Sequence, residues 1–435
     1  MSPDRYVVAG LAHVRSSWFT EVSRWATMGA LPVEFLKCLS AEELRALLAG
    51  GRPLSAVLLD ARHPGVDRDL LASIERASAA RLVVVEPADV TDWHDLGASV
   101  VLAAPVHREG LLAALAEHAT AIESMPAGCL PAPPVSPGGW LAPLIAVIGS
   151  PGAGTSTVSG ALAQALADDP ARHDQVLLAD LARRAHQGVL HDARDVVPGL
   201  PDLVERHRTG RIPVAETRAI TFPVPGRGYR LLLGLRHPGQ WVALRTGAVT
   251  ASLESLRRSF RLVVADVDGD LEGEAETGSF DVEDRNRLAR TAVEAADLVV
   301  VVGCGTSTGM FDLVRGLADL AHHGVAGART LVVLNRGPSS GRRRAELTRA
   351  LAELTSAPAA AHTYIGPMFL RSRRGLDEIH RDVARFPASF SGPLAATIGP
   401  LLDGGLPAGP PRPGAEPPPT RIEPGSLGHW TEDAS

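Results

Sequence analysis

The stretch Leu144-Ile-Ala-Val-Ile-Gly-Ser-Pro-Gly-Ala-Gly-Thr-Ser-Thr157 decides the fold of the larger part of this chain. Five apolar residues, typical of a strand that is buried on both faces, run into a glycine-rich turn. From Ser156 onward the apolar residues have the spacing of an amphipathic helix. Glycines let backbone N–H groups converge on an anion, and the N-terminus of a helix adds a partial positive charge. The order of strand, glycine-rich turn and helix therefore predicts a phosphate-binding corner.

The spacing within this turn matches a P-loop except at one position. Gly149 and Gly154 are separated by four residues, and Ser156 stands where a P-loop carries the hydroxyl that ligates Mg²⁺. Thr155 occupies the position of the usual lysine. The alternative interpretation is a glycine turn that joins a strand to a helix in an ordinary α/β domain and binds no ligand.

Composition excludes several other classes of protein. The 435 residues include 43 Lys or Arg and 49 Asp or Glu, which gives a net charge of −6. Proteins that bind nucleic acid over their whole surface are basic, so this charge argues against that class. Three separated cysteines form neither a disulfide framework nor a Cys-x-x-Cys metal pair, which favours a reducing, cytoplasmic location. No apolar run is long enough for a transmembrane segment. Lys37 is the only lysine, so no chemistry in the rest of the chain can use one.

The chain divides into two α/β units. Residues 5–122 contain five alternations of strand and helix, which predict a parallel sheet with helices on both faces. Residues 123–143 are rich in proline and glycine and indicate a linker. Residues 144–402 repeat the alternation on a larger scale, and we expect the proline- and glycine-rich residues 403–435 to be a disordered tail. The predicted fold class is α/β, with two doubly wound parallel sheets.

Short apolar runs give the expected strands. In the smaller unit they cover residues 6–12, 33–39, 56–59, 82–85 and 100–103. In the larger unit they cover residues 144–148, 176–179, 230–233, 262–265, 298–302, 331–334 and about 362–365, with helices such as 156–167 and 285–296 between them.

Three further strand ends carry polar residues in an order that is typical of one family. The strands Val176-Leu-Leu-Ala-Asp180, Leu262-Val-Val-Ala-Asp266 and Leu331-Val-Val-Leu-Asn335 follow the turn 149–157. Together these four stretches resemble the motifs of the MinD/ParA-type deviant P-loop ATPases. The chain is most similar to their CpaE/TadZ-like branch, which carries a receiver-like domain in front, and to septum-site-determining proteins of actinobacteria.

This resemblance implies a nucleotide site and its ligands. ATP would be bound by Gly149, Gly152, Ala153, Gly154, Thr155, Ser156, Thr157 and Asn335, the last reading the adenine edge. Mg²⁺ would be held by Ser156 and Asp266, and the catalytic candidates are Asp180 and Asp266.

The chain departs from the family pattern where hydrolysis is concerned. The signature lysine falls at Ser150, the second P-loop lysine at Thr155, and the second Asp of the Asp-x-Asp motif at Ala182. A charge that stabilises phosphoryl transfer is worth roughly 10³–10⁵ in rate, so these losses predict weak hydrolysis or none. An arginine such as Arg183 or Arg184 would be the available substitute. The alternatives are a partner-stimulated ATPase of the partitioning class and a scaffold with a vestigial P-loop.

The smaller unit resembles a CheY-like receiver domain without its phosphorylation chemistry. Asp60 ends the third strand, where receivers carry the phosphorylated aspartate. The first strand ends without an acidic residue, and Ala104 replaces the lysine that would precede Pro105. We therefore expect a pseudo-receiver used for docking or dimerisation, with Asp60 as a local capping carboxylate. Phosphorylation of Asp60 is the alternative.

An acidic stretch follows the strand that ends at Asp266. Carboxylates alternate with other residues through Glu276, but an EF-hand loop would need glycine at Leu271 and glutamate at Thr277. We expect a solvated or partner-facing acidic loop, extended by the repulsion of like charges.

The resemblance also implies partners and a place in the cell. It points to a homodimer that acts with division proteins or with a pilus or secretion ATPase, at the cytoplasmic side and peripherally at the inner face of the membrane. The arginine clusters 342–344 and 371–374 offer weak contact with DNA or a membrane surface.

Overall fold

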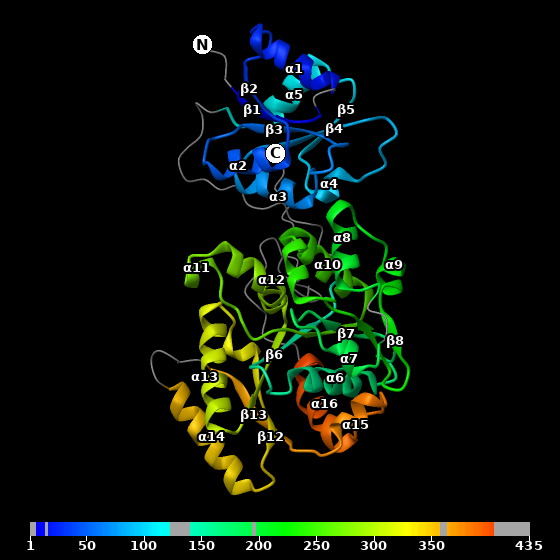
Figure 1. Cartoon of the computed structure of the whole chain (residues 1–435), viewed down its shortest axis with the longest axis vertical. Coiled ribbons are helices and arrows are strands. Elements are labelled where there is room, and N and C mark those ends of the chain that lie inside the picture. The colour runs from blue at the N-terminus through cyan, green and yellow to red at the C-terminus, as the bar shows by residue number, and fades with distance from the viewer. Residues whose placement is uncertain (1–5, 14–15, 122–139, 194–196, 357–362, 404–435) are drawn as a thin grey trace, which may run out of the picture.

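The computed structural model describes residues 6–13, 16–121, 140–193, 197–356 and 363–403, which form two sheets with separate cores (Figure 1). Most of the predicted linker and the tail from residue 404 lie outside the described residues. The fold class is α/β, as predicted. No helix in the described ranges is long and apolar enough to cross a bilayer.

The smaller unit is a five-stranded parallel sheet in the order β2-β1-β3-β4-β5. This is the strand order of flavodoxin-like doubly wound folds, which include CheY. Its strands are β1 (Tyr6–Leu11), β2 (Val33–Cys38), β3 (Ala56–Asp60), β4 (Ala80–Val85) and β5 (Val100–Ala103). Its helices are α1 (Ser17–Thr27), α2 (Ala41–Ala49), α3 (Arg68–Arg76), α4 (Trp93–Leu96) and α5 (Arg108–His118).

The larger unit is an eight-stranded sheet in the order β13-β12-β11-β6-β10-β7-β9-β8. Its strands are β6 (Leu144–Gly149), β7 (Val176–Asp180), β8 (Phe222–Val224), β9 (Tyr229–Leu232), β10 (Leu262–Asp266), β11 (Leu298–Cys304), β12 (Thr330–Gly337) and β13 (Ile365–Arg371). The central strands are buried along their length because helices cover both faces of the sheet, and each face has its own apolar core.

The two edge strands differ from the sequence prediction. The short β8 runs antiparallel to β9 and was not expected, and β13 lies three residues beyond the expected strand at 362–365. Each contains a proline, Pro223 in β8 and Pro367 in β13. Proline lacks the N–H needed in a central strand but is tolerated at an edge, so the sequence signal was that of a loop.

Helices connect the strands of the larger unit. They are α6 (Thr155–Ala167), α7 (Gln187–Leu190), α8 (Leu200–Thr209), α9 (Val214–Ala219), α10 (Thr246–Ser259), α11 (Glu274–Thr277), α12 (Phe280–Ala295), α13 (Ser307–His322), α14 (Gly341–Thr355), α15 (Leu376–Arg381) and α16 (Ala388–Asp403), with the 3-10 turns η2 (Pro238–Ala243) and η3 (Gly327–Arg329). The helix expected from residue 285 begins five residues earlier, and α16 includes one residue of the expected tail.

Helix α3 of the smaller unit packs against α8 and α10 of the larger one (Figure 1). Asp69 accepts a hydrogen bond of 2.9 Å from the backbone N–H of Gly247, in the first turn of α10. The N-cap residue of α10, Arg245, provides no side-chain cap of its own. Beside this contact, Asp67 pairs with Arg208 at the end of α8, with 3.1 Å between Oδ2 and Nη1. The smaller unit therefore caps a helix of the larger unit.

We expect Asp69→Ala to be less stable than Asp69→Asn by about 1 kcal/mol, the usual value of a helix N-cap. Asparagine keeps an oxygen that can accept from the Gly247 N–H, whereas both variants lack the carboxylate whose pKa is raised by burial. The measurement is the midpoint of thermal unfolding, followed by circular dichroism. The same pair of substitutions at Asp281 is the control, because Asp281 is an exposed acidic residue in the first turn of α12. Equal midpoints for Asp69→Ala and Asp69→Asn would contradict the cap.

Candidate functional site

The predicted site residues gather at one edge of the larger sheet. The carboxyl ends of parallel strands meet at a common edge, where ligands of open α/β sheets bind. In the ladder of β7 and β10, Asp180 pairs with Asp266, and in that of β11 and β12, Cys304 pairs with Asn335. The glycine-rich turn lies between β6 and α6 at the same edge.

The turn has a backbone that requires glycine. Gly152 and Gly154 have φ values of +83° and +92°, a region that other residues rarely adopt. A Cβ atom on Gly154 would lie only 2.5 Å from Nδ2 of Asn335. Gly154 is also the N-cap of α6 and offers no side chain, so the first-turn amides of this helix have no side-chain cap. Pro151 and Gly152 are exposed at the turn, which leaves these amides as candidates for an anion.

Asn335 supports the turn from the neighbouring strand. It is buried, its Nδ2 donates to the carbonyl of Ala153 over 2.8 Å, and its Oδ1 accepts from the N–H of Arg336 over 2.9 Å. Both polar ends of the Asn335 carboxamide therefore already have hydrogen-bond partners within the protein. Recognition of an adenine edge by Asn335 stays a prediction.

Asp180 and Asp266 are buried side by side, and neither forms an ion pair within the described residues. Burial, and then the neighbouring charge of Asp266, raises the pKa of Asp180 well above its ordinary value. Burial also raises the pKa of Asp266, although hydrogen bonds from Gln187, Ser156 and Ser159 act in the opposite direction. Two buried carboxylates that are held only by neutral donors form a site that favours a proton or a metal cation.

Gln187 and Ser159 belong to this site, and the sequence analysis missed both. Nε2 of Gln187 donates to Oδ2 of Asp266 over 2.7 Å and to the carbonyl of Ser156 over 3.0 Å. The Ser159 hydroxyl lies 3.2 Å from Oδ1 of Asp266 and 2.9 Å from the carbonyl of Thr155, so these two acceptors share its one proton. Ser159 lies one helical turn after Ser156, and that spacing could have pointed to it. Gln187 follows Asp180 by seven residues with no periodic signal, so only the folded chain reveals it.

The donor set suits a hard divalent cation. Mg²⁺ prefers carboxylate, hydroxyl and amide oxygens, the groups that Asp266, Ser156 and Gln187 carry. No cluster of three or more His, Cys, Asp or Glu side chains that could hold a metal ion occurs in the described part of the chain. A cation here would therefore complete its coordination with neutral oxygens, phosphate or water.

The positions of the second P-loop lysine and of the second aspartate of the Asp-x-Asp motif hold Thr155 and Ala182, which carry no charge. Thr155 opens α6, and Ala182 is buried just beyond the end of β7. The backbone N–H of Arg183 donates to Asp268 over 2.8 Å. Among the described residues, the guanidinium groups of Arg183 and Arg184 make no hydrogen bond or ion pair, so the structure does not fix them toward the turn.

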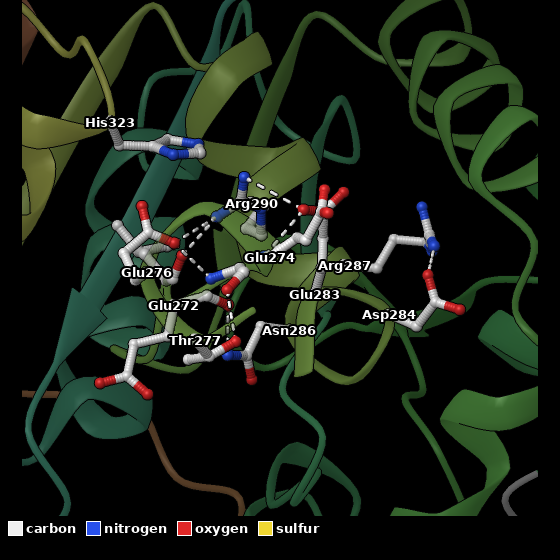
Figure 2. Close-up of polar contacts among 12 residues, drawn as sticks. Glu272, Glu274, Glu276, Thr277, Glu283, Asp284, Asn286, Arg287, Arg290 and His323 are labelled. Atoms are coloured by element: carbon white, nitrogen blue, oxygen red, sulfur yellow. Dashed lines mark hydrogen bonds and ion pairs between the residues drawn. The ribbon is translucent and has the colours of Figure 1, made fainter. Parts of the chain in front are cut away.

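The acidic stretch after β10 is folded back onto α12 rather than extended (Figure 2). Two arginines of α12 contact it: Arg285 lies 3.0 Å from Asp270, and Arg290 lies 4.0 Å from Glu276. Glu276 also accepts from the backbone N–H of Gly273 over 2.7 Å, at the start of the short helix α11. The expected solvent exposure is confirmed, since Glu272, Glu274 and Glu276 are exposed. The expected extension by repulsion is wrong, because arginines from the following helix compensate the charge of the loop.

Asp60 of the smaller unit is occupied by a neighbour in the chain. The N–H and Nε of Arg62 donate to Oδ1 of Asp60 over 3.0 and 3.2 Å, and Nη2 donates to Oδ2 over 3.3 Å. Although burial acts to raise it, these bonds and the Arg62 charge leave the pKa of Asp60 below its ordinary value. Asp60 thus has a local capping role at the end of β3, while its phosphorylation remains an alternative.

We expect the stability of Asp180→Asn, measured relative to the wild type, to rise by about 1 kcal/mol or more between pH 4 and pH 7.5, or ~2–4 °C in Tm. A cost that does not depend on pH accompanies this gain, because the amide N–H2 faces the backbone N–H of Gln187 or of Ala182. A carboxyl group whose pKa is raised by folding destabilises the folded state as pH rises above its unfolded pKa near 3.8. The gain should therefore shrink as the pH falls toward 4. Differential scanning fluorimetry across this range is the measurement, with the exposed Asp281→Asn as control. A gain that does not depend on pH would contradict the assignment.

Comparison with known proteins gives similarity to solved structures alone. No protein-family model matches the chain, and no curated protein matches it. The cell division ATPase MinD of Pyrococcus furiosus is 16% identical, covers 60% of this chain and 100% of its own, and has a TM-score of 0.45. The septum site-determining protein MinD of Pyrococcus horikoshii, complexed with Mg-ADP, is 16% identical over 60% of this chain and 97% of its own, with a TM-score of 0.45. A ParA family ATPase of Chlorobium tepidum is 11% identical over 59% and 98%, with a TM-score of 0.45.

Proposed function

We propose that this chain is a nucleotide-binding regulatory factor that holds ATP with Mg²⁺ at the glycine-rich turn and hydrolyses it slowly or not at all. The observation that carries this proposal is the uncapped N-terminus of α6, reached through glycines at positive φ, beside the buried carboxylate of Asp266. The turn offers backbone donors to phosphate, and the carboxylate offers oxygen to a cation.

Each group has a distinct role in this proposal. The amides of Gly152 and of residues 154–157 bind the phosphates, and the helix N-terminus adds its partial charge. The N–H of Ala153 is already used, because it donates to the carbonyl of Ser150 over 3.0 Å. The Ser156 hydroxyl and Asp266 hold Mg²⁺, which neutralises phosphate charge when bound. Asn335 keeps the turn in its binding shape by its bond to Ala153.

Slow hydrolysis follows from the groups that the site lacks. Ser150 and Thr155 cannot supply the positive charge of a P-loop lysine, and Ala182 cannot orient water. Binding depends less on these groups, because backbone amides and Mg²⁺ remain. A nucleotide would then set the state of the protein rather than be consumed rapidly.

The motif resemblance extends the proposal to the cellular role. We propose a homodimer that helps to place the division septum or the pilus and secretion machinery, at the cytoplasmic face of the membrane. Arg371, Arg373 and Arg374 are exposed where β13 ends, and Arg342 and Arg343 are exposed on α14. These arginines supply local positive charge for weak contact with DNA or anionic lipid, despite the net negative charge of the chain.

The test is thermal unfolding of the full chain with and without ATP and Mg²⁺. A ligand at about 1 mM with a Kd of tens of micromolar stabilises by roughly 2 kcal/mol, which raises Tm by several degrees. Gly154→Ala should abolish the shift, because φ and the contact with Asn335 both oppose a side chain. Gly316→Ala on α13 is the matched control, since a Cβ there meets no atom within 4 Å.

A parallel assay of phosphate release separates the alternative functions. We expect release near background in the wild type. Fast release that Ser156→Ala abolishes would establish an active ATPase instead. A wild-type Tm that ATP and Mg²⁺ leave unchanged at millimolar concentration would establish a scaffold with a vestigial P-loop.

A further inference from the structure

The Thr157 hydroxyl, in the first turn of α6, has an unusual partner for a hydroxyl on a helix. Within helices a Ser or Thr hydroxyl commonly donates to the carbonyl four residues earlier. On α10, Ser252 does so to Ala248 over 2.7 Å, and Thr250 does likewise over 3.1 Å. Thr157 makes no such bond among the described residues. Its Oγ1 lies 3.1 Å from Nε2 of His380 on α15, so another element sets the orientation of this hydroxyl.

The two carbonyls that Thr157 would otherwise use already have donors. The carbonyl of Ala153 accepts from Nδ2 of Asn335 over 2.8 Å, and the carbonyl of Gly154 accepts from the N–H of Val158 over 3.0 Å. A hydroxyl that bonded to one of these carbonyls would give up its only proton, because a carbonyl can only accept. Its lone pairs alone would then face an anion at the turn, and they would repel it.

Two buried anchors fix the position of the His380 imidazole. Arg227 donates to the carbonyl of Ile379, the residue before His380, over 3.1 Å. Gln164 on α6 bonds to the N–H of Phe386 over 2.8 Å and to its carbonyl over 2.9 Å. The ring of Phe386 meets the imidazole edge-on, with 5.4 Å between the ring centres. His380 is buried, and its contact with the P-loop helix is thus held from both sides along the chain.

The imidazole of His380 is neutral near pH 7. Burial, followed by the charge of Arg227, lowers its pKa. Nδ1 is buried and forms no hydrogen bond among the described residues, although the Leu190 carbonyl acts to raise the pKa of the ring. No second partner therefore locks the tautomer. Nε2 can accept the proton of Thr157 or donate its own to the Thr157 oxygen, whereas a backbone carbonyl can only accept.

We infer that His380 is a positioning residue for the phosphate-binding turn, which keeps the Thr157 hydroxyl off its own helix and frees its proton for a phosphate oxygen. In the ligand-bound state Nε2 of His380 donates to Oγ1 of Thr157, and Oγ1 donates to the phosphate. Hydrogen bonds in such a chain polarise one another, which strengthens each of them. The inference rests on the nucleotide function proposed above and adds to that site a residue from α15, more than 200 positions away in the sequence.

The test is isothermal titration calorimetry of the full chain with tripolyphosphate and, separately, with ATP, both in the presence of Mg²⁺. His380→Leu should weaken the binding of both about threefold to tenfold, the effect of one hydrogen bond. Thr157→Val should cause a similar loss. In the Thr157→Val background, His380→Leu should cause no further loss, because the imidazole then has no hydroxyl to orient. His207→Leu is the matched control, since His207 is also a buried histidine but lies on α8.

Several results would overturn the assignment. They are an affinity of His380→Leu that equals or exceeds that of the wild type, or an equal loss from His380→Leu in both backgrounds. If His380→Leu does not fold, Thr157→Val decides, and wild-type affinity of that variant for tripolyphosphate overturns the inference. ATP binding that His380→Leu leaves unchanged overturns this inference alone. Tripolyphosphate binding that depends on His380, without any binding of ATP, overturns the nucleotide function and supports the role of His380. Binding of neither ligand by the wild type overturns both.

Discussion

Two carboxylates that end adjacent strands, Asp180 and Asp266, set the constraint on which the rest of this site depends. Both are buried, and no cationic side chain pairs with either among the described residues. Burial of an unpaired charge is costly, so each oxygen must be met by a neutral donor, a proton or a metal ion. The hydroxyl of Ser159 and the amide groups of Gln187 meet this need within the protein. The P-loop helix and α7 are thereby held at the same carboxylate.

The contacts made by Gln187 extend well beyond the carboxylates. The chain from Gln187 through His191 and Tyr229 ends on Arg227, a fully buried arginine. Arg227 donates to the carbonyls of Ile379 and Ala384 in the C-terminal segment (residues 376–403), and no carboxylate among the described residues pairs with it. Its guanidinium lies 4.6 Å from the ring centre of Phe386 in the same segment. The C-terminal segment also returns to the P-loop helix.

His380 makes this return contact, with Nε2 3.1 Å from the hydroxyl of Thr157. Thr157 follows Ser156 in the first turn of α6, so two consecutive residues of that turn are bonded to separate parts of the larger unit. The smaller unit also helps to support this site. It caps α10 through Asp69, and the chain passes from α10 directly into β10, which ends at Asp266. The site is therefore braced by α7, by the C-terminal segment and by a helix that the smaller unit caps.

The amino-acid sequence by itself determined the α/β class, the two units and the buried central strands, because its apolar runs have the length of strands and alternate with helical patterns. It also placed Gly154, Asp180, Asp266 and Asn335 at the ends of strands or at their turns, since parallel strands bring those ends to one edge. The edge strand β8 escaped prediction, and β13 was predicted three residues too early, because their prolines resemble loop residues in sequence. Only the tertiary structure decided that Gln187 joins the carboxylates and that arginines fold the acidic loop back. These contacts link residues without periodic spacing, and only chain reversals in three dimensions bring them together.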